Sequence, residues 1–400
     1  MCERSLKRRK VLYLTSETYP YGKAYASRVR AIVKMLNYSG CSVTVLCDQI
    51  SDSGSYSDEC TYYEAIPNKL SGISKFLKLP TIYCNKVEEL LENDKYDIVI
   101  ARSMFDRHNR LLSAVKRHNI PFILESCECY DKKSFGNQLM NVRYYQFRYC
   151  WNHSYNKVDA IIAISRYIED HYKRIGLKTF RLPAILDTTT INFQKGFIRR
   201  YPVKLIYSGD ITGKKELLDE IILAISGIDH DGSVIEFNIY GPSKESVFNT
   251  LSNRSLDYIR NTSNIKIHGR IPQNQIYAKI AESDLGIFIR PNRVSSNAGF
   301  PTKLGEYLAM GLPVIANDTG DISLVLKSSY NGFLLNGNTS CEIEAALRAY
   351  LNMKDSEVET MKENARISAE KWFDPKGYYK SMDKFLNDVS SNFQIKGSRI

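Results

Sequence analysis

The sequence predicts an α/β fold in which two doubly wound parallel-sheet domains follow one another. Three observations carry this prediction. The 400 residues suffice for two domains of ordinary size. Short apolar runs alternate with amphipathic helical segments throughout the chain, as in βαβ units. The alternation begins afresh near residue 201.

The first domain, expected over residues 1–190, opens with a strand at 10–15 and a second strand at 42–47. Between them, apolar residues recur at i, i+3, i+4 and i+7, which is one face of a helix: Val29, Ile32, Val33 and Leu36. Gly40 ends that helix. Further strands buried on both faces are expected at 97–101, 121–125 and 159–163, with helices around 107–118 and 137–155.

The second domain, expected over residues 201–375, repeats the pattern. A linker is expected near 183–202. The tail 376–400 is expected to be helical and to pack back on either domain, with the first domain as the candidate. The strands of the second domain are predicted at 201–209, 234–240, 265–269, 285–289 and 313–316.

The charge of the chain is uneven. Of the net charge of +11, residues 1–200 hold 32 basic and 20 acidic side chains, and the remainder 23 and 24. Nucleic acid, an anionic membrane surface and a phosphorylated substrate all suit the basic half. The segment 69–78 places Leu70, Ile73 and Leu77 at helical spacing between lysines, which fits either a membrane surface or an ordinary surface helix.

No apolar run is long enough to cross a bilayer, and the run 11–14 is too short for the core of a signal peptide. We therefore expect a cytoplasmic protein, with a peripheral position at the inner face of the membrane as the open alternative. The nine cysteines have irregular spacings without a CxxC pair, so we expect reduced thiols and no metal site.

The segment that favours chemistry most strongly is a helix start that follows a loop at 295–299. Pro301 and Thr302 begin the helix, with Thr302 as the expected N-cap, and Lys303 lies at the same end. Free N–H groups and the helix dipole make such an end an anion site. Glu306, one turn later, can accept hydrogen bonds from ligand hydroxyls. A plain helix cap with a surface glutamate is the alternative.

This segment, Pro-Thr-Lys-Leu-Gly-Glu-Tyr-Leu-Ala-Met-Gly-Leu-Pro-Val-Ile over 301–315, resembles the signature of the group 1 glycosyltransferases. These are retaining nucleotide-sugar enzymes with two Rossmann-like domains, the GT-B architecture. The resemblance implies donor binding by Pro301, Thr302, Lys303 and Glu306. The first glutamate of the family pattern is replaced here by Ala298.

Two further segments resemble the donor side of that family. The run 206–215 matches its strand, glycine loop and basic residue, which implies that Gly209, Lys214 and Lys215 hold the donor diphosphate; Lys215 is the preferred catalytic cation. Where the family often has an arginine, this chain has Asp210. The run 265–290, with Arg270, resembles the stretch around the nucleobase.

On the acceptor side, the loop with Gly22 and Lys23 resembles the acceptor loop of the family. The family's histidine after a buried strand corresponds to Cys127 here, and Glu125 or Glu128 could replace it in polarising an acceptor hydroxyl. Glu128 is the catalytic candidate; a carboxylate that only caps the next loop is the alternative.

The resemblance implies a hexosyl- or N-acetylhexosaminyltransferase without cofactor or metal, with Lys215 and Glu306 as central residues. The donor would be a nucleoside-diphosphate sugar, UDP more than GDP, and the acceptor a saccharide or polyprenyl-linked saccharide of surface polysaccharide biosynthesis. The site is expected in a cleft between the domains. An epimerase or phosphorylase on the same fold is the alternative. A nucleic-acid-binding protein is the remote one, since no nucleic-acid module is recognisable and no such partner is expected.

Overall fold

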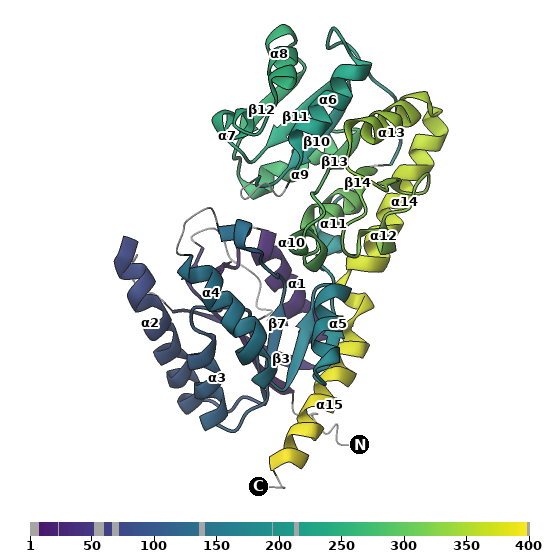
Figure 1. Ribbon diagram of the computed structural model, residues 1–400. Helices are drawn as coiled ribbons and strands as arrows, with labels where there is room; N and C mark the ends of the chain where they lie inside the picture. The colour runs from purple at the N-terminus through teal and green to yellow at the C-terminus, as the bar shows by residue number, and fades with distance from the viewer. Residues whose placement is uncertain are drawn as a thin grey trace, which may run out of the picture. The chain divides into compact units, whose positions relative to one another are not determined.

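The computed structural model describes residues 8–22, 24–51, 60–65, 72–135, 141–193, 195–211 and 216–397. The chain divides into two compact units, and each is built on its own parallel sheet. Unit 1 comprises Met1–Asp187 with Asp374–Ile400, and unit 2 comprises Thr188–Phe373. The prediction of two parallel-sheet α/β domains is confirmed (Figure 1).

Unit 1 contains a seven-stranded sheet in the order β5-β3-β1-β6-β7-β8-β9, with every neighbouring pair parallel. Its strands are β1 (Arg9–Leu14), β3 (Cys41–Cys47), β5 (Thr61–Glu64), β6 (Ile98–Arg102), β7 (Phe122–Ser126), β8 (Ala160–Ala163) and β9 (Lys178–Arg181). Two short strands, β2 (Thr18–Tyr19) and β4 (Gln49–Ile50), pair separately. The edge strands β5 and β9 were not predicted, because neither has the continuous apolar run of a central strand.

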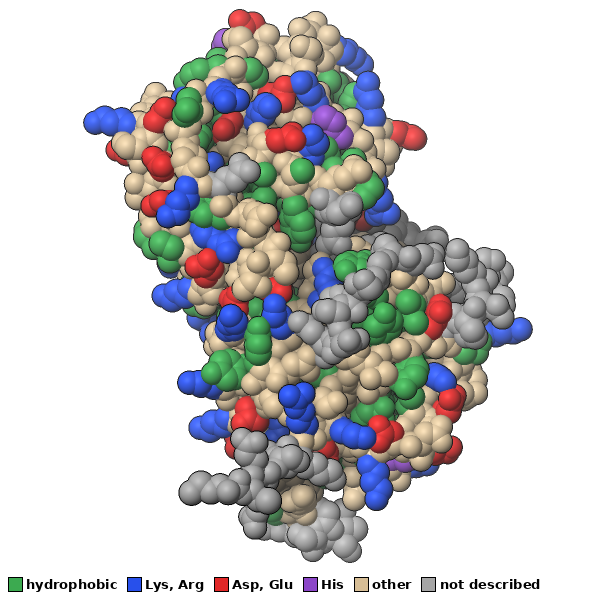
Figure 2. All heavy atoms as spheres, turned by 180° about the vertical axis from the view of Figure 1, so that it is seen from behind, with side chains coloured by type: hydrophobic (Ala, Val, Ile, Leu, Met, Phe, Trp, Pro, Cys, Tyr) green, Lys and Arg blue, Asp and Glu red, His purple; other side chains and the backbone are tan. Residues whose placement is uncertain are grey.

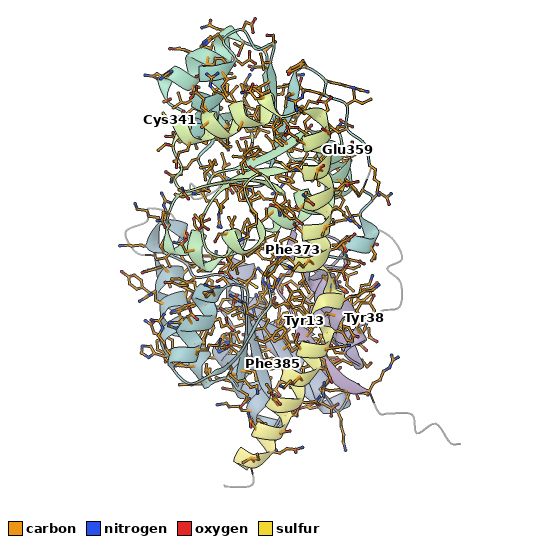
Figure 3. The ribbon with its side chains drawn as sticks, turned by 90° about the vertical axis from the view of Figure 1, so that its right-hand side faces the viewer. Tyr13, Tyr38, Cys341, Glu359, Phe373 and Phe385 are labelled. Atoms are coloured by element: carbon orange, nitrogen blue, oxygen red, sulfur yellow. The ribbon has the colours of Figure 1, made fainter. Side chains whose placement is uncertain are left out.

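Helices cover both faces of this sheet. Helices α1 (Ala24–Tyr38) and α15 (Tyr379–Gly397) share one hydrophobic core with it, to which Tyr13 and Phe385 both belong (Figure 3). On the other face, α3 (His108–Arg117) places the ring of His108 against Phe122 of β7, with the ring centroids 5.9 Å apart. The remaining helices of unit 1 are α2 (Gly72–Asn93), α4 (Val142–Tyr149) and α5 (Arg166–Arg174). The tail therefore packs on unit 1.

Unit 2 contains six parallel strands in the order β12-β11-β10-β13-β14-β15. They are β10 (Val203–Ser208), β11 (Ile235–Tyr240), β12 (Ile265–Gly269), β13 (Leu285–Phe288), β14 (Val314–Asn317) and β15 (Gly332–Leu335). Its helices are α6 (Leu218–Ile228), α7 (Lys244–Phe248), α8 (Asn253–Asn261), α9 (Gln273–Ala281), α10 (Val294–Ala298), α11 (Thr302–Ala309), α12 (Ile322–Val325), α13 (Ser340–Asn352) and α14 (Asp355–Phe373). The loop predicted at 295–299 is mostly the short helix α10, a correction to the sequence analysis.

Each sheet has one point where the strand order reverses. In unit 1 the reversal lies between β1 and β6, and in unit 2 between β10 and β13. Ligands of doubly wound sheets bind outside the carboxyl ends of the strands at this point. Ligand contacts are therefore expected from the residues that follow β1 and β6 in unit 1, and from those that follow β10 and β13 in unit 2.

Across the described residues, no helix is both long and apolar enough to span a bilayer. Basic side chains do not form one continuous patch on the face drawn in Figure 2, where Lys and Arg alternate with Asp and Glu. Part of the candidate membrane segment 69–78 lies outside the described residues; from Gly72 onward its backbone belongs to α2.

Candidate active site

An ion pair marks the reversal point of unit 2. The Nζ of Lys303, in the first turn of α11, lies 2.6 Å from Oε1 of Glu216, just before α6. The next residue, Leu217, donates its N–H to the carbonyl of Ile289 over 2.8 Å, which fixes the Glu216 loop to the end of β13. Both side chains of the pair are largely buried, at 12% and 5% exposure.

Two aromatic rings surround the same ammonium group. The Nζ of Lys303 lies 4.2 Å from the ring centroid of Tyr207 and 5.4 Å from that of Phe288. Burial lowers the pKa of Lys303, while the carboxylate of Glu216 acts in the opposite direction. The two rings and the carboxylate hold the ammonium group of Lys303 at the end of β10. An anionic ligand bound there would interact with this ammonium group in place of the water that burial has removed from it.

Glu216 was missed by the sequence analysis. Its Oε2 is buried and has no hydrogen-bond partner among the described residues. A buried carboxylate oxygen without a partner is costly, so a site beside it is a natural place for a ligand donor group. No sequence signal pointed to Glu216 beyond its place directly after two lysines, because its partner is 87 residues away.

Glycines bring the backbones of β10 and β11 together at this edge. A Cβ on Gly209, whose φ is +152°, would lie 3.0 Å from Nζ of Lys303. A Cβ on Gly241, whose φ is +115°, would lie 2.0 Å from the carbonyl oxygen of Gly209. Gly209 therefore allows the ammonium group of Lys303 to lie close against the backbone at the end of β10, where a side chain would crowd it.

Glu306 lies one turn along α11 from Lys303. Burial raises its pKa to about 7, against the opposing effect of Lys303. The next side chain, Tyr307, binds the end of β10 through its hydroxyl, which accepts from the Ser208 N–H at 2.7 Å. This contact fixes the first turns of α11 at the reversal point.

The start of α11 differs in one detail from the prediction. Pro301 is the N-cap residue and Thr302 is the first residue of the helix, so the expected Thr302 cap is wrong. No side chain caps this helix. Proline cannot accept such a bond, so the first N–H groups of α11 are not capped by a side chain.

The other predicted donor residues do not add to the contacts around Lys303. Lys214 and Lys215 lie outside the described residues. Arg270 is exposed and follows Gly269 at the end of β12. Just before it, the ring of His268 stacks on that of Tyr240 with the centroids 4.3 Å apart.

A second polar cluster occupies the reversal point of unit 1. Arg102, at the end of β6, forms an ion pair with Glu17, which follows β1. Its guanidinium lies 3.6 Å from the ring centroid of Tyr25. The hydroxyl of Tyr25 donates to the carboxylate of Glu128, a half-buried side chain beyond β7. The structure thus places Glu128 in a connected polar group that sequence reasoning had found only in part.

Glu125 has a different environment. It is 1% exposed, and it accepts from Arg28 at 2.7 Å and from Tyr13. Burial acts to raise its pKa, but Arg28 and Tyr13 outweigh this effect and hold the pKa below its usual value. Cys127, whose thiol donates to Glu125 over 3.4 Å, has its pKa raised to about 12 by burial. Glu125 and Cys127 are thus buried and bonded within unit 1.

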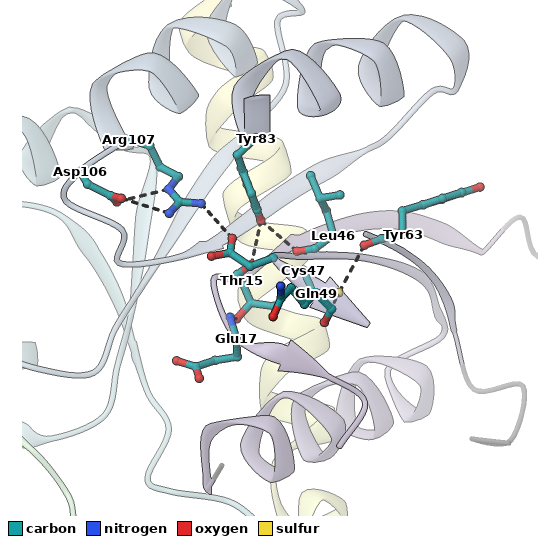
Figure 4. Close-up of polar contacts among 10 residues, drawn as sticks. Thr15, Glu17, Leu46, Cys47, Gln49, Tyr63, Tyr83, Asp106 and Arg107 are labelled. Carbon is teal, nitrogen blue, oxygen red and sulfur yellow. Dashed lines mark hydrogen bonds and ion pairs between the residues drawn. The ribbon is translucent and has the colours of Figure 1, made fainter. Parts of the chain in front are cut away.

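A neighbouring network fixes the loops after β1 and β3 (Figure 4). The buried guanidinium of Arg107 binds Asp48 at 2.9 Å and Asp106 at 3.0 Å. The hydroxyl of Tyr83 donates to the carbonyls of Thr15 and Leu46. Thr15 lies two residues before Glu17, so this network holds one side of the polar cluster in place.

Gly22 lies between β2 and α1, where a Cβ would approach the Thr18 carbonyl to 3.1 Å, and Lys23 lies outside the described residues.

Over the described part of the chain, no three His, Cys, Asp or Glu side chains are grouped as metal ligands.

Two family models match the chain. The model described as Glycosyl transferases group 1 matches residues 188–368, and that described as Glycosyltransferase Family 4 matches residues 26–185. A search of curated proteins gave no match.

Solved structures with GT-B folds are similar over nearly the whole chain. Sucrose-phosphate synthase from Thermosynechococcus elongatus aligns with a TM-score of 0.74 and 13% identity, covering 96% of this chain and 100% of that one. HepE from Anabaena, solved with UDP and glucose, aligns with a TM-score of 0.65 and 14% identity, covering 95% and 100%. The lipopolysaccharide outer core galactosyltransferase WaaB aligns with a TM-score of 0.61 and 14% identity, covering 95% and 99%. At these identities the structures show the fold, while the two family models carry the assignment. The chain belongs to the group 1 glycosyltransferases and has their GT-B architecture.

Proposed function

We propose that this glycosyltransferase is a retaining enzyme that uses a nucleoside-diphosphate sugar. One observation carries the proposal: at the reversal point of unit 2, the largely buried ammonium group of Lys303, in the first turn of α11, lies against Gly209. A buried cation and free N–H groups suit a diphosphate.

In this proposal Lys303 and the start of α11 bind the donor diphosphate, with Lys214 and Lys215 as further cations. Glu306 accepts hydrogen bonds from hydroxyls of the donor. The bond between the anomeric carbon and the β-phosphate oxygen breaks, and its electron pair leaves with the nucleoside diphosphate. The cations offset the charge that develops there, which is the largest contribution the protein makes to the rate.

The acceptor binds unit 1 in this proposal. Its hydroxyl oxygen attacks the anomeric carbon on the face from which the phosphate leaves, and its proton passes to the released phosphate. Glu128, which is held by Tyr25, orients that hydroxyl. Glu125 is not proposed for this role, because Arg28 and Tyr13 already occupy its carboxylate.

UDP is the proposed nucleotide, and a saccharide or lipid-linked saccharide of surface polysaccharide biosynthesis is the proposed acceptor. HepE, with its bound UDP and glucose, supports the first, and WaaB supports the second. The transferred group would be a hexosyl or N-acetylhexosaminyl unit. An enzyme in the cytoplasm, bound to an anionic membrane surface, would meet a lipid-linked acceptor there.

Thermal unfolding with UDP, GDP, CDP and ADP in turn tests the donor site. A ligand at a hundredfold its dissociation constant adds about 2.7 kcal/mol of stability. We expect UDP to raise the Tm of the wild type and to have little effect on Lys303→Ala. Equal responses of the two proteins would contradict the proposed site.

Retention is tested separately, with a UDP-sugar as donor and methanol as a surrogate acceptor. The anomeric proton of the methyl glycoside reports its configuration by NMR. The configuration of the donor is expected in the product, and the opposite configuration would show an inverting enzyme.

A further inference from the structure

Helix α4 of unit 1 leaves an apolar stripe uncovered. Val142, Tyr145 and Tyr149 lie at i, i+3 and i+7, which is one face of the helix, and their exposures are 55%, 58% and 54%. Tyr167, near the start of α5, is also 41% exposed. The three residues of α4 are among the large hydrophobic residues that the described structure exposes most.

The opposite face of the helix is firmly packed, so the stripe has a fixed orientation. Phe147 is buried, with its ring centroid 5.0 Å from that of Tyr130 and 5.8 Å from that of Trp151. At the start of the helix, the side chain of Asn141 accepts from the Tyr144 N–H and donates to the Phe135 carbonyl. The exposed stripe thus lies on a helix that is anchored on its other face, the helix labelled α4 in Figure 1.

Positive charge lies on both sides of the stripe. On a helical wheel, Arg143 and Arg148 flank the three exposed residues, and both arginines are exposed. Trp151, just after α4, stacks on His171 of α5 with the ring centroids 4.6 Å apart, which places α5 beside the end of α4. Between residues 132 and 157 the sequence has five Lys or Arg and no Asp or Glu: Lys132, Lys133, Arg143, Arg148 and Lys157.

We propose that the α4 surface, formed by Val142, Arg143, Tyr145, Arg148, Tyr149 and Tyr167, docks on an anionic lipid membrane. Tyrosine suits the level of the headgroups, because its ring enters the apolar boundary while its hydroxyl remains hydrated. Arginines beside it are attracted to acidic lipids. The inference rests on the proposed membrane partner and names the surface that meets it, which differs from the segment 69–78 suggested by the sequence.

Charge decides between lipid and other occupants. A second copy of the chain, bound through the same surface, would bring Arg143 and Arg148 against their own counterparts and would need acidic groups to offset them. An anionic bilayer is complementary to both arginines without any specific partner residue.

Vesicle flotation of the full chain tests the proposal. The wild type is expected to float with vesicles of phosphatidylcholine and phosphatidylglycerol at low salt, less so in 0.5 M salt, and not with phosphatidylcholine alone. Arg143→Glu with Arg148→Glu should lower the partition coefficient at least about tenfold. Arg254→Glu with Arg260→Glu on α8 changes the net charge equally and should have a much smaller effect.

Tyr145→Ser with Tyr149→Ser is the second variant, since both side chains are more than half exposed and their loss should leave the fold intact. It should also weaken flotation, while Tyr330→Ser in unit 2 should not. Flotation of both α4 variants at wild-type levels would overturn the proposal. So would concentration-dependent dimers that these variants abolish without any flotation.

The UDP-induced rise in Tm, measured on the same proteins, separates this inference from the proposed function. Variants that lose flotation and keep the UDP response support the docking surface. Flotation that depends on α4 in a protein without any UDP response would refute the donor proposal and leave the docking surface supported.

Discussion

Lys303 and Glu216 form a buried ion pair, 2.6 Å apart, at the point where the strand order of unit 2 reverses. The two residues come from different crossover connections, one before α6 and one in α11. The pair brings a cation to a place where this chain has Asp210 in the sequence position that the family often gives to arginine.

Loss of that cation should impair the donor site. Lys303→Ala is expected to lower kcat/KM by about a hundredfold or more, because a preorganised charge acts on the departing diphosphate. Steady-state kinetics with the donor identified by thermal unfolding measures this effect. A tenfold loss or less would show that Lys303 supports the fold and not the reaction.

Glu216 should act through Lys303. Glu216→Gln removes the counter-charge, so burial should lower the pKa of Lys303 further. The alkaline limb of the kcat/KM profile is then expected to move to lower pH by about one unit or more. Glu220→Gln, a change on α6 one turn beyond the ion pair, is the control and should leave the limb in place. A uniform loss of rate without any shift would refute the positioning role.

Two glycines of the same edge should respond differently to alanine. In Gly241→Ala the new Cβ meets backbone 2.0 Å away, so we expect a large loss of stability. In Gly209→Ala it meets the flexible end of Lys303, so the loss should be about 1–2 kcal/mol from the positive φ. UDP affinity should nevertheless fall in the folded Gly209→Ala protein, because the ammonium group is displaced. Calorimetric titration of UDP checks this, and unchanged affinity would contradict the proposed contact between UDP and Lys303.

Much of the architecture follows from local patterns. The buried strands and the helix start at Pro301 are visible as apolar runs and cap residues, since each depends on neighbours in the chain. The edge strand β9 is half-buried and lacks such a run, so it is recognised as a strand only from its pairing with β8.

The site was harder to predict, because its contacts are distant in sequence. Lys303 and Glu306 were found from a motif, whereas Glu216 owes its role to a partner that only the sheet topology brings near. Likewise, Glu125 and Glu128 are three residues apart and look equivalent in sequence. Only the fold shows that Arg28 holds the first and Tyr25 the second.

These two glutamates should therefore separate stability from activity. Glu125→Ala leaves Arg28 buried without its partner and should cost about 3–5 kcal/mol. Glu128→Ala should cost less than about 1 kcal/mol, since its carboxylate is only half-buried, but it should lower kcat for acceptor transfer. Urea unfolding and transfer assays on both variants test the pair. The reverse pattern would make Glu125 the acceptor contact.

Acid should destabilise unit 1 through His108. Burial lowers its pKa to about 4, and its Nε2–H donates to the Ser154 carbonyl. Because the unfolded chain binds a proton near pH 6.5, the stability contributed by neutral His108 is present above that pH. It is lost as the pH falls toward 4, by up to about 3 kcal/mol. His108→Gln should flatten the decline in urea unfolding, whereas His230→Gln, at an exposed site, should not.

Glu306 should give the donor site a neutral-pH dependence. Its pKa of about 7 exceeds the ordinary value, so the folded state favours the protonated form. The contribution of Glu306 to stability is then greatest below about pH 4.5 and declines through pH 7, and Glu306→Gln should be more stable than the wild type at pH 8 by about 1–3 kcal/mol. If the ionised form accepts donor hydroxyls, kcat/KM of the wild type should rise with pH through about 7. In Glu306→Gln, kcat/KM should no longer rise with pH and should be at least about tenfold lower than in the wild type. Glu245→Gln, on α7, should keep the wild-type kcat/KM and its rise with pH. A rise that persists in Glu306→Gln would assign the dependence to another group.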